Sequence, residues 1–272
     1  MNSVVERIRR ELKANADEKT RQSIQRFFKE QVKSYGVKTD IVHKIAKKHW
    51  SEVKLLDKKG IFQICEELYR SGIIEEAFVP AFWLPNMAEK FEPEDLATFR
   101  AWIEKYIDNW AECDVLCNHT VGDLIEKYPE TVSELKKWAK SENHWLKRAA
   151  AVSLIIPAKR GEFLKDVFEI SDILLQDKYD MVQKGYGWLL KEASRKRQKE
   201  VFEYVLRNKK RMPRTALRYA IELMPKELKT EAMKKASVLT YAPICRFNQQ
   251  LVFSPSFCSS LRGQLSIGAL AR

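Results

Sequence analysis

Residues 108–122 read DNWAECDVLCNHTVG, and both the fold and the candidate site can be approached from this stretch. Trp110 and Asp114 stand four residues apart, which places them on one face of a helix. The stretch lies within residues 109–128, for which the spacing of apolar residues predicts one long helix or a helix pair. An aromatic face beside a carboxylate suits a cationic species, so this helix is also a candidate site.

Helical spacing of apolar residues continues on both sides of this helix. The predicted helices are short, at about three turns each, and no segment shows the sustained alternation of a strand. The chain has only 9 Gly and 9 Pro in 272 residues, which argues against a β-sandwich or barrel. Helices are predicted over residues 4–12, 21–32, 40–50, 61–69, 74–87 (kinked or broken at its prolines), 93–107, 109–128, 132–139, 145–156, 163–175, 182–193, 198–206 and 213–223.

Short amphipathic helices with short connections are the units of helical-repeat proteins. No strict period is visible, and the tetratricopeptide and ankyrin signatures are absent. We therefore predict an all-α fold, a curved solenoid of antiparallel HEAT-like helical repeats. A compact, non-repeating bundle is the alternative architecture.

The composition is that of a globular protein with an excess of positive charge. Lys and Arg number 49 and Asp and Glu 37, a formal net charge of +12, which favours a polyanionic partner such as nucleic acid. No apolar run approaches the roughly 20 residues that span a bilayer. The charged N-terminus has no apolar signal segment, and the five Cys are irregularly spaced. We expect a cytoplasmic protein that associates with the nucleoid through DNA.

The composition changes near the C-terminus. Residues 237–272 contain no acidic residue and no Lys, and helical spacing does not continue there. We expect a helical domain over residues 1–236 and a poorly ordered tail over residues 237–272.

Two later segments carry residues that would complement Trp110 and Asp114. NHWLKRAAA (143–151) contains Trp145 and Arg148, and QKGYGWLLKEA (183–193) contains Trp188. A carboxylate between indoles would stabilise the oxocarbenium-like transition state of glycosidic cleavage, and an arginine would hold a neighbouring phosphate. The alternative is that the tryptophans are core residues and that Asp114 pairs with Arg148.

The sequence gives little support for a metal site, a cofactor site or a catalytic triad. Cys113, Cys117 and His119 lie close together, but a zinc site needs a fourth ligand and usually a second pair, so we expect no metal. There is no Ser/His/Asp order, phosphate loop or dinucleotide fingerprint, and we expect no cofactor.

Three ordered signatures resemble the AlkD-type DNA alkylation repair glycosylases, which are built from HEAT-like repeats. The first is Trp-x-x-x-Asp followed by Val-Gly-Asp (residues 110–114 and 121–123). The second is Asn-x-Trp-Leu-x-Arg-Ala-Ala (143–150), and the third is Gln-Lys-x-x-Gly-Trp-x-Leu-x-Glu (183–192). The resemblance extends over about residues 20–225 in length and helix spacing, but only these signatures are sharp.

The resemblance implies a monofunctional enzyme that hydrolyses the N-glycosidic bond of cationic alkylated purines, such as 3-methyladenine and 7-methylguanine, in duplex DNA. Asp114 would be the catalytic carboxylate, Trp110 and Trp188 would contact the deoxyribose, and Arg148 would hold the backbone. Phe27 stands where many members carry a Tyr near the lesion, and Asn109 where a second Trp occurs. The family leaves the base stacked rather than flipping it.

We assign Arg148, Lys184, Phe27 and Trp145 to the DNA-binding surface, and we expect a monomer without an obligate protein partner. Two other functions remain open. One is a non-catalytic helical-repeat protein that binds damaged or branched DNA, and the other is a protein-binding scaffold.

Overall fold

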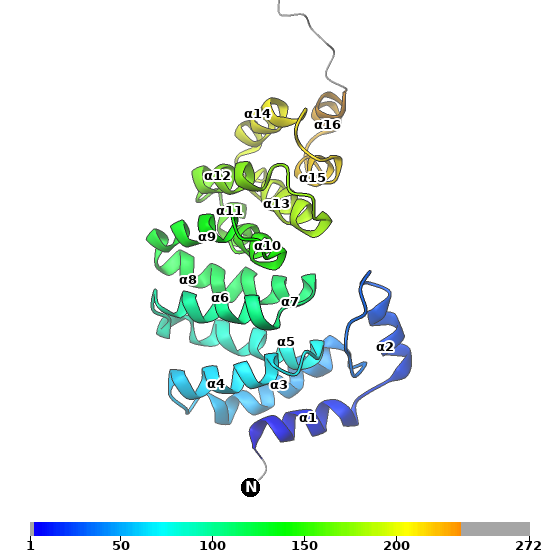
Figure 1. The fold of residues 1–272 in the computed structure, drawn as a ribbon, viewed down its shortest axis with the longest axis vertical. Helices are drawn as coiled ribbons and strands as arrows, with labels where there is room; N and C mark the ends of the chain where they lie inside the picture. Colours follow the sequence, from blue (N-terminus) through cyan, green and yellow to red (C-terminus); the bar gives the residue numbers. More distant parts are fainter. Residues whose placement is uncertain (1–2, 235–272) are drawn as a thin grey trace, which may run out of the picture. The chain divides into compact units, whose positions relative to one another are not determined.

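The computed structural model describes residues 3–234, and every regular element in that range is a helix (Figure 1). The single β-contact in that range is an isolated bridge between Lys33 and Ile73. The all-α prediction is confirmed. The predicted tail, residues 237–272, lies outside the described residues.

The elements follow one another in the order α1 (Val4–Ala14), α2 (Glu18–Gln25), α3 (Thr39–Val53), α4 (Lys58–Tyr69), α5 (Ile74–Trp83), η1 (Leu84–Lys90), α6 (Asp95–Tyr106), α7 (Trp110–Val115), η2 (Leu116–Val121), α8 (Gly122–Lys127), η3 (Pro129–Thr131), α9 (Val132–Trp138), α10 (His144–Val152), α11 (Ile155–Lys159), α12 (Leu164–Leu174), α13 (Asp180–Ala193), α14 (Gln198–Asn208), α15 (Arg214–Ala220) and α16 (Lys226–Met233). The last of these, α16, has no counterpart among the predicted helices.

Helices near one another in the chain pack together. Helix α3 contacts α1 and α5, α10 contacts α7, α9 and α13, and α13 contacts α12 and α15. Each of these helices thus buries its apolar face against helices that are near it in the chain, as expected of a helical-repeat protein. The HEAT type and the curvature of the repeat stay predictions. Within the described range, no helix combines the length and the apolar character needed to cross a membrane.

A continuous apolar core runs through these pairs. Its largest fully buried side chains include Trp83, Trp102 and Trp138. The indole Nε1 of Trp83 donates to the carbonyl of Ala46 at 2.7 Å, so even this buried polar atom is satisfied. Some of the seven tryptophans are therefore core residues, while Trp110 and Trp188 remain half-buried.

One predicted helix ends earlier than the apolar spacing indicates, and another is divided in two. The helix predicted over residues 21–32 ends at Gln25, whose side-chain Oε1 accepts the backbone N–H of Val32 at 3.1 Å after the chain has turned. The helix predicted over residues 145–156 is divided at Ser153, where the backbone meets α8. A Cβ on Gly122 would lie 2.9 Å from the Ser153 carbonyl oxygen. In the second case, close helix packing overrides the local spacing.

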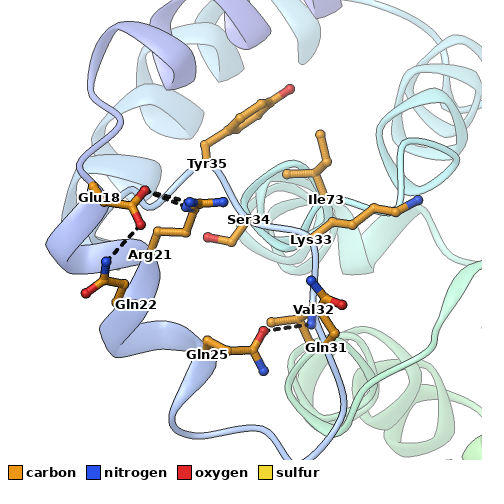
Figure 2. Close-up of a pocket in the computed structure, with 10 residues that line it drawn as sticks. All are labelled: Glu18, Arg21, Gln22, Gln25, Gln31, Val32, Lys33, Ser34, Tyr35 and Ile73. Atoms are coloured by element: carbon orange, nitrogen blue, oxygen red, sulfur yellow. Dashed lines mark hydrogen bonds and ion pairs between the residues drawn. The ribbon is translucent and has the colours of Figure 1, made fainter.

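Residues 17–36, which we call the arm, join α1 to α3 and contain α2. The ends of the arm meet where the Asp17 N–H donates to the Gly36 carbonyl at 3.0 Å. A cavity of about 680 Å³ separates α2 from the returning residues 31–35 (Figure 2). No residue from position 13 to position 35 is buried, so the arm adds little to the core.

Glu75 of α5 fixes the returning end of the arm. Its buried carboxylate accepts the backbone N–H groups of Tyr35, Gly36 and Val37 at 2.9–3.0 Å and the Ser34 hydroxyl at 2.7 Å. Four donors satisfy a charge that would otherwise be costly to bury. The base of the arm is thus held firmly, while α2 packs loosely.

Gly36 should be more sensitive to substitution than Gly72, although both have a positive φ (84° and 64°). A Cβ on Gly36 would lie 2.3 Å from the Asp17 carbonyl oxygen, whereas a Cβ on Gly72 would meet nothing within 4 Å. Gly72→Ala adds only backbone strain, of about 1 kcal/mol. We expect Gly36→Ala to lower the free energy of unfolding, measured with urea, by at least about 1 kcal/mol more. Equal losses would contradict the close approach at the base of the arm.

Glu112 of α7 should make stability depend on pH. Burial raises the pKa of its carboxyl from 4.5 to about 7. The folded state holds this proton more tightly than the unfolded chain does. The contribution of Glu112 to the free energy of unfolding is therefore fully present below about pH 4.5 and is lost as the pH rises through about 7. Glu112→Gln should remove up to about 3 kcal/mol of this loss, as judged by denaturation of both proteins between pH 4.5 and 8. Parallel pH profiles would show that Glu112 does not titrate in this window.

Candidate functional site

Helix α7 begins where Asn109 caps it. The Asn109 side-chain Oδ1 accepts the backbone N–H of Glu112 at 3.0 Å, and Asn109 itself is extended (φ −143°, ψ 161°). Trp110 is therefore the first helical residue, and Asp114 follows one turn later on the same face. Asn109 stands where the resemblance implies a second Trp, and its structural role is to cap this helix.

Asp114 forms a bidentate ion pair with Arg148 of α10. Arg148 Nε lies 2.8 Å from Asp114 Oδ1, and Arg148 Nη2 lies 2.8 Å from Asp114 Oδ2. Both residues are buried, with relative exposures of 8% and 5%. Burial raises the pKa of Asp114, and the hydrogen bonds and positive charge of Arg148 oppose that rise. The pairing considered as an alternative from sequence is the observed geometry, and it brings two of the predicted site residues into contact.

Arg148 is in turn held by α13. Its Nη1 donates to the carbonyl of Met181, and a Cβ on Gly185 would lie 3.4 Å from Arg148 Cγ. Glycine at position 185 thus leaves room for the arginine stem between α10 and α13. A guanidinium has five N–H donors, and the three contacts to Asp114 and Met181 leave two for another acceptor.

The two half-buried tryptophans line neighbouring cavities. Trp110 lines a cavity of about 220 Å³, and Trp188 of α13 lines a larger one of about 690 Å³. Both cavities include Thr39 and Phe78 in their walls. The two indoles therefore belong to adjoining hollows that share a wall, rather than to one common pocket.

Polar residues also line the larger cavity, and of those named next only Glu192 belongs to a family signature. Among them are Asn118, Lys159, Glu192 and Arg195. Asn118 lies on η2, a π-helical turn that directly follows α7. Such turns are frequent at functional sites, but apolar spacing gives no sign of them. The position of Asn118, four residues after Asp114, is the sequence signal that was available.

The other predicted DNA-binding residues are dispersed around this centre. Phe27 is highly exposed, at 71%, and lines the Trp110 cavity. Lys184 Nζ pairs with Asp180 at 2.8 Å. Trp145 is buried, and its carbonyl accepts the thiol of Cys113 at 3.6 Å, so it belongs largely to the core.

The cysteine and histidine cluster has no metal-binding geometry. Cys113 and Cys117 are buried thiols, whereas the His119 side chain is 61% exposed and lies 4.0 Å from Asp123. Across residues 3–234, no group of three or more His, Cys, Asp or Glu side chains is arranged to hold a metal ion.

Comparison with solved structures shows that other proteins have a similar fold. The chain matches a predicted DNA alkylation repair enzyme from Enterococcus faecalis with a TM-score of 0.71 and 17% identity, over 78% of this chain and 98% of that one. It also matches smu.31 from Streptococcus mutans UA159 with a TM-score of 0.49 and 20% identity, over 84% of this chain and 98% of that one. At these identities the first likeness concerns the fold alone.

A search of curated protein sequences gives no match. The sequence does match a family described as DNA alkylation repair enzyme, over residues 8–224. That range contains α7, α10 and α13, the three helices that carry Trp110, Asp114, Arg148 and Trp188. The chain belongs to the family of DNA alkylation repair enzymes, with the role in DNA repair and the binding of DNA that membership implies.

Proposed function

We propose that the protein is a monofunctional DNA glycosylase that hydrolyses the N-glycosidic bond of cationic alkylated purines, such as 3-methyladenine and 7-methylguanine, in duplex DNA. The observation that carries this proposal is the buried Asp114, held by Arg148 through two hydrogen bonds of 2.8 Å in a chain of this repair family. A fixed buried carboxylate is suited to stabilising a developing positive charge.

A single carboxylate is enough for this reaction. A purine alkylated on a ring nitrogen is already cationic, so it leaves with the electron pair of the C1′–N bond and needs no general acid. The sugar acquires oxocarbenium character, which the negative charge of Asp114 stabilises. A water oxygen then bonds to C1′, and its proton passes to Asp114 or to solvent. Trp110 and Trp188 would contribute cation–π attraction from the two neighbouring cavities.

Arg148 supports this chemistry in two ways. Its bidentate contact fixes the orientation of Asp114 and opposes the rise that burial causes in the pKa of this carboxyl. Its two remaining N–H donors are suited to a DNA phosphate. Because removal of one partner from a buried pair leaves an uncompensated charge, each residue also stabilises the other.

DNA contacts outside this pair would be mainly electrostatic. The net charge of +12 favours sequence-independent binding to phosphates, and Lys184 is our main candidate after Arg148. We assign Phe27 and Trp145 to the same surface, and propose a cytoplasmic monomer without a cofactor or an obligate protein partner.

Asp114→Asn should abolish release of 7-methylguanine and 3-methyladenine from methylated duplex DNA. The change removes the negative charge but keeps the shape and one acceptor for Arg148. The matched control is Asp166→Asn, which alters a half-buried carboxyl that pairs with Lys136 and lies outside the three signatures. We expect a loss of at least about 100-fold for Asp114→Asn, with normal release by the control. Bases are measured by chromatography after incubation.

Two outcomes would contradict the proposal. Release by Asp114→Asn at the wild-type rate would exclude Asp114 as the catalytic carboxylate. No release by the wild type, together with tight duplex binding, would instead favour the non-catalytic protein that binds damaged or branched DNA.

Lys184→Ala should weaken binding of undamaged duplex and reduce its salt dependence. Loss of one phosphate contact lowers the slope of log K against log salt concentration by about 1. Lys165→Ala is the matched control, because both lysines form an ion pair with an acid four residues away. A gel-shift titration between about 50 and 200 mM salt measures the slope. Over this range the affinity of a protein with several phosphate contacts falls by roughly 10³-fold or more. Equal slopes for the two variants would remove Lys184 from the interface. Only weak, salt-sensitive association of the wild type with DNA would favour a protein-binding scaffold.

A further inference from the structure

The tip of the arm, residues 26–31, reaches two elements of the candidate site. The Phe28 ring stacks on the Trp110 indole with centroids 5.4 Å apart and planes inclined by 27°. On the other side, Lys29 Nζ lies 3.4 Å from Asp180 Oδ2 at the start of α13. The tip therefore links the N-terminal part of the chain to both α7 and α13.

Cavities on both sides of the tip show that it is not packed into the core. Phe27 and Phe28 line the 220 Å³ cavity with Trp110. Lys29 and Glu30 line another, of about 110 Å³, with residues of α10 and α13. Helix α2, which precedes the tip, buries none of its residues. Few contacts thus oppose movement of the tip away from Trp110.

The ion pair at Asp180 is weak and adjustable. The side chains of Lys29 and Asp180 are 72% and 38% exposed, so water and salt screen their attraction. Asp180 also pairs with Lys184 at 2.8 Å, and both lysines lower the pKa of its carboxyl. A DNA phosphate near α13 would compete with Asp180 for both lysines.

We propose that the arm tip is a reversible strap over Trp110, with Phe28 as its cover and the Lys29–Asp180 pair as its latch. In the closed form Phe28 occupies one face of the indole. Release of the latch frees that face for substrate and leaves Lys29 and Lys184 for phosphate. The proposal rests on the role of Trp110 proposed above, but the movement itself is a property of the free protein.

The base of the arm is suited to such a movement. Glu75 and the Asp17–Gly36 hydrogen bond hold its two ends. The tip can therefore move while its ends stay in place, and the entropy lost on closing remains small because the ends are already together.

Hydroxyl-radical oxidation of Trp110, located by mass spectrometry, measures the exposure of this indole without DNA. Trp188 is the internal reference, because it is also half-buried and does not contact the arm tip. We expect Lys29→Asp and Asp180→Lys each to raise oxidation of Trp110 by about two- to fivefold, the range set by an exposed ion pair. Phe28→Ala should raise it as well.

The charge-swapped double variant, Lys29→Asp with Asp180→Lys, should lower oxidation of Trp110 from that of either single variant toward the wild-type level, because it restores the pair between positions 29 and 180 without changing the net charge. Lys165→Asp, which breaks an unrelated exposed pair with Glu169, should have no effect. Two results would overturn the strap. One is equal oxidation of Trp110 in the wild type and in all variants. The other is oxidation of Trp110 in the double variant that is as high as in the single variants. Because no DNA is used, this result is independent of base release, and absence of base release by the wild type would count against the glycosylase alone.

Discussion

The ion pair between Asp114 and Arg148 is the constraint on which the candidate site depends. It joins α7 to α10, and through the Met181 carbonyl it also ties in α13. Two charges are removed from water here, at a cost that only good geometry and further hydrogen bonds can offset. The surrounding structure meets that need, since Gly185 makes room for the arginine stem and the Asn109 cap fixes the start of α7.

The residues around this ion pair are packed less tightly. Trp110 and Trp188 are half-buried beside separate cavities, and the arm lies against Trp110 with few buried contacts of its own. Glu75 limits this freedom by fixing the base of the arm with four hydrogen bonds. A fixed carboxylate beside half-buried aromatic residues suits the proposed reaction, in which duplex DNA must bind before the carboxylate acts.

The departures from the sequence predictions have tertiary causes. Ile24, Phe27 and Phe28 have helical spacing, yet α2 ends at Gln25 and Phe28 packs on Trp110 instead. The predicted continuous helix at α10 is interrupted where Ser153 meets Gly122. The shared wall of the two cavities involves residues far apart in the chain, and no local pattern contains that information. The π-helical turn at Asn118 is local, but apolar spacing does not distinguish it from an α-helical turn.

By itself, the sequence determined the all-α class, most of the helices and the three signatures that single out Asp114, Trp110, Arg148 and Trp188, because apolar spacing and short motifs are local properties of a chain. The tertiary structure decided how those residues meet. It pairs Asp114 with Arg148 in a buried bidentate contact, separates the two indoles between adjoining cavities and lays the arm over Trp110. Such relations depend on packing between distant helices, where burial, charge and close backbone approach outweigh local preference.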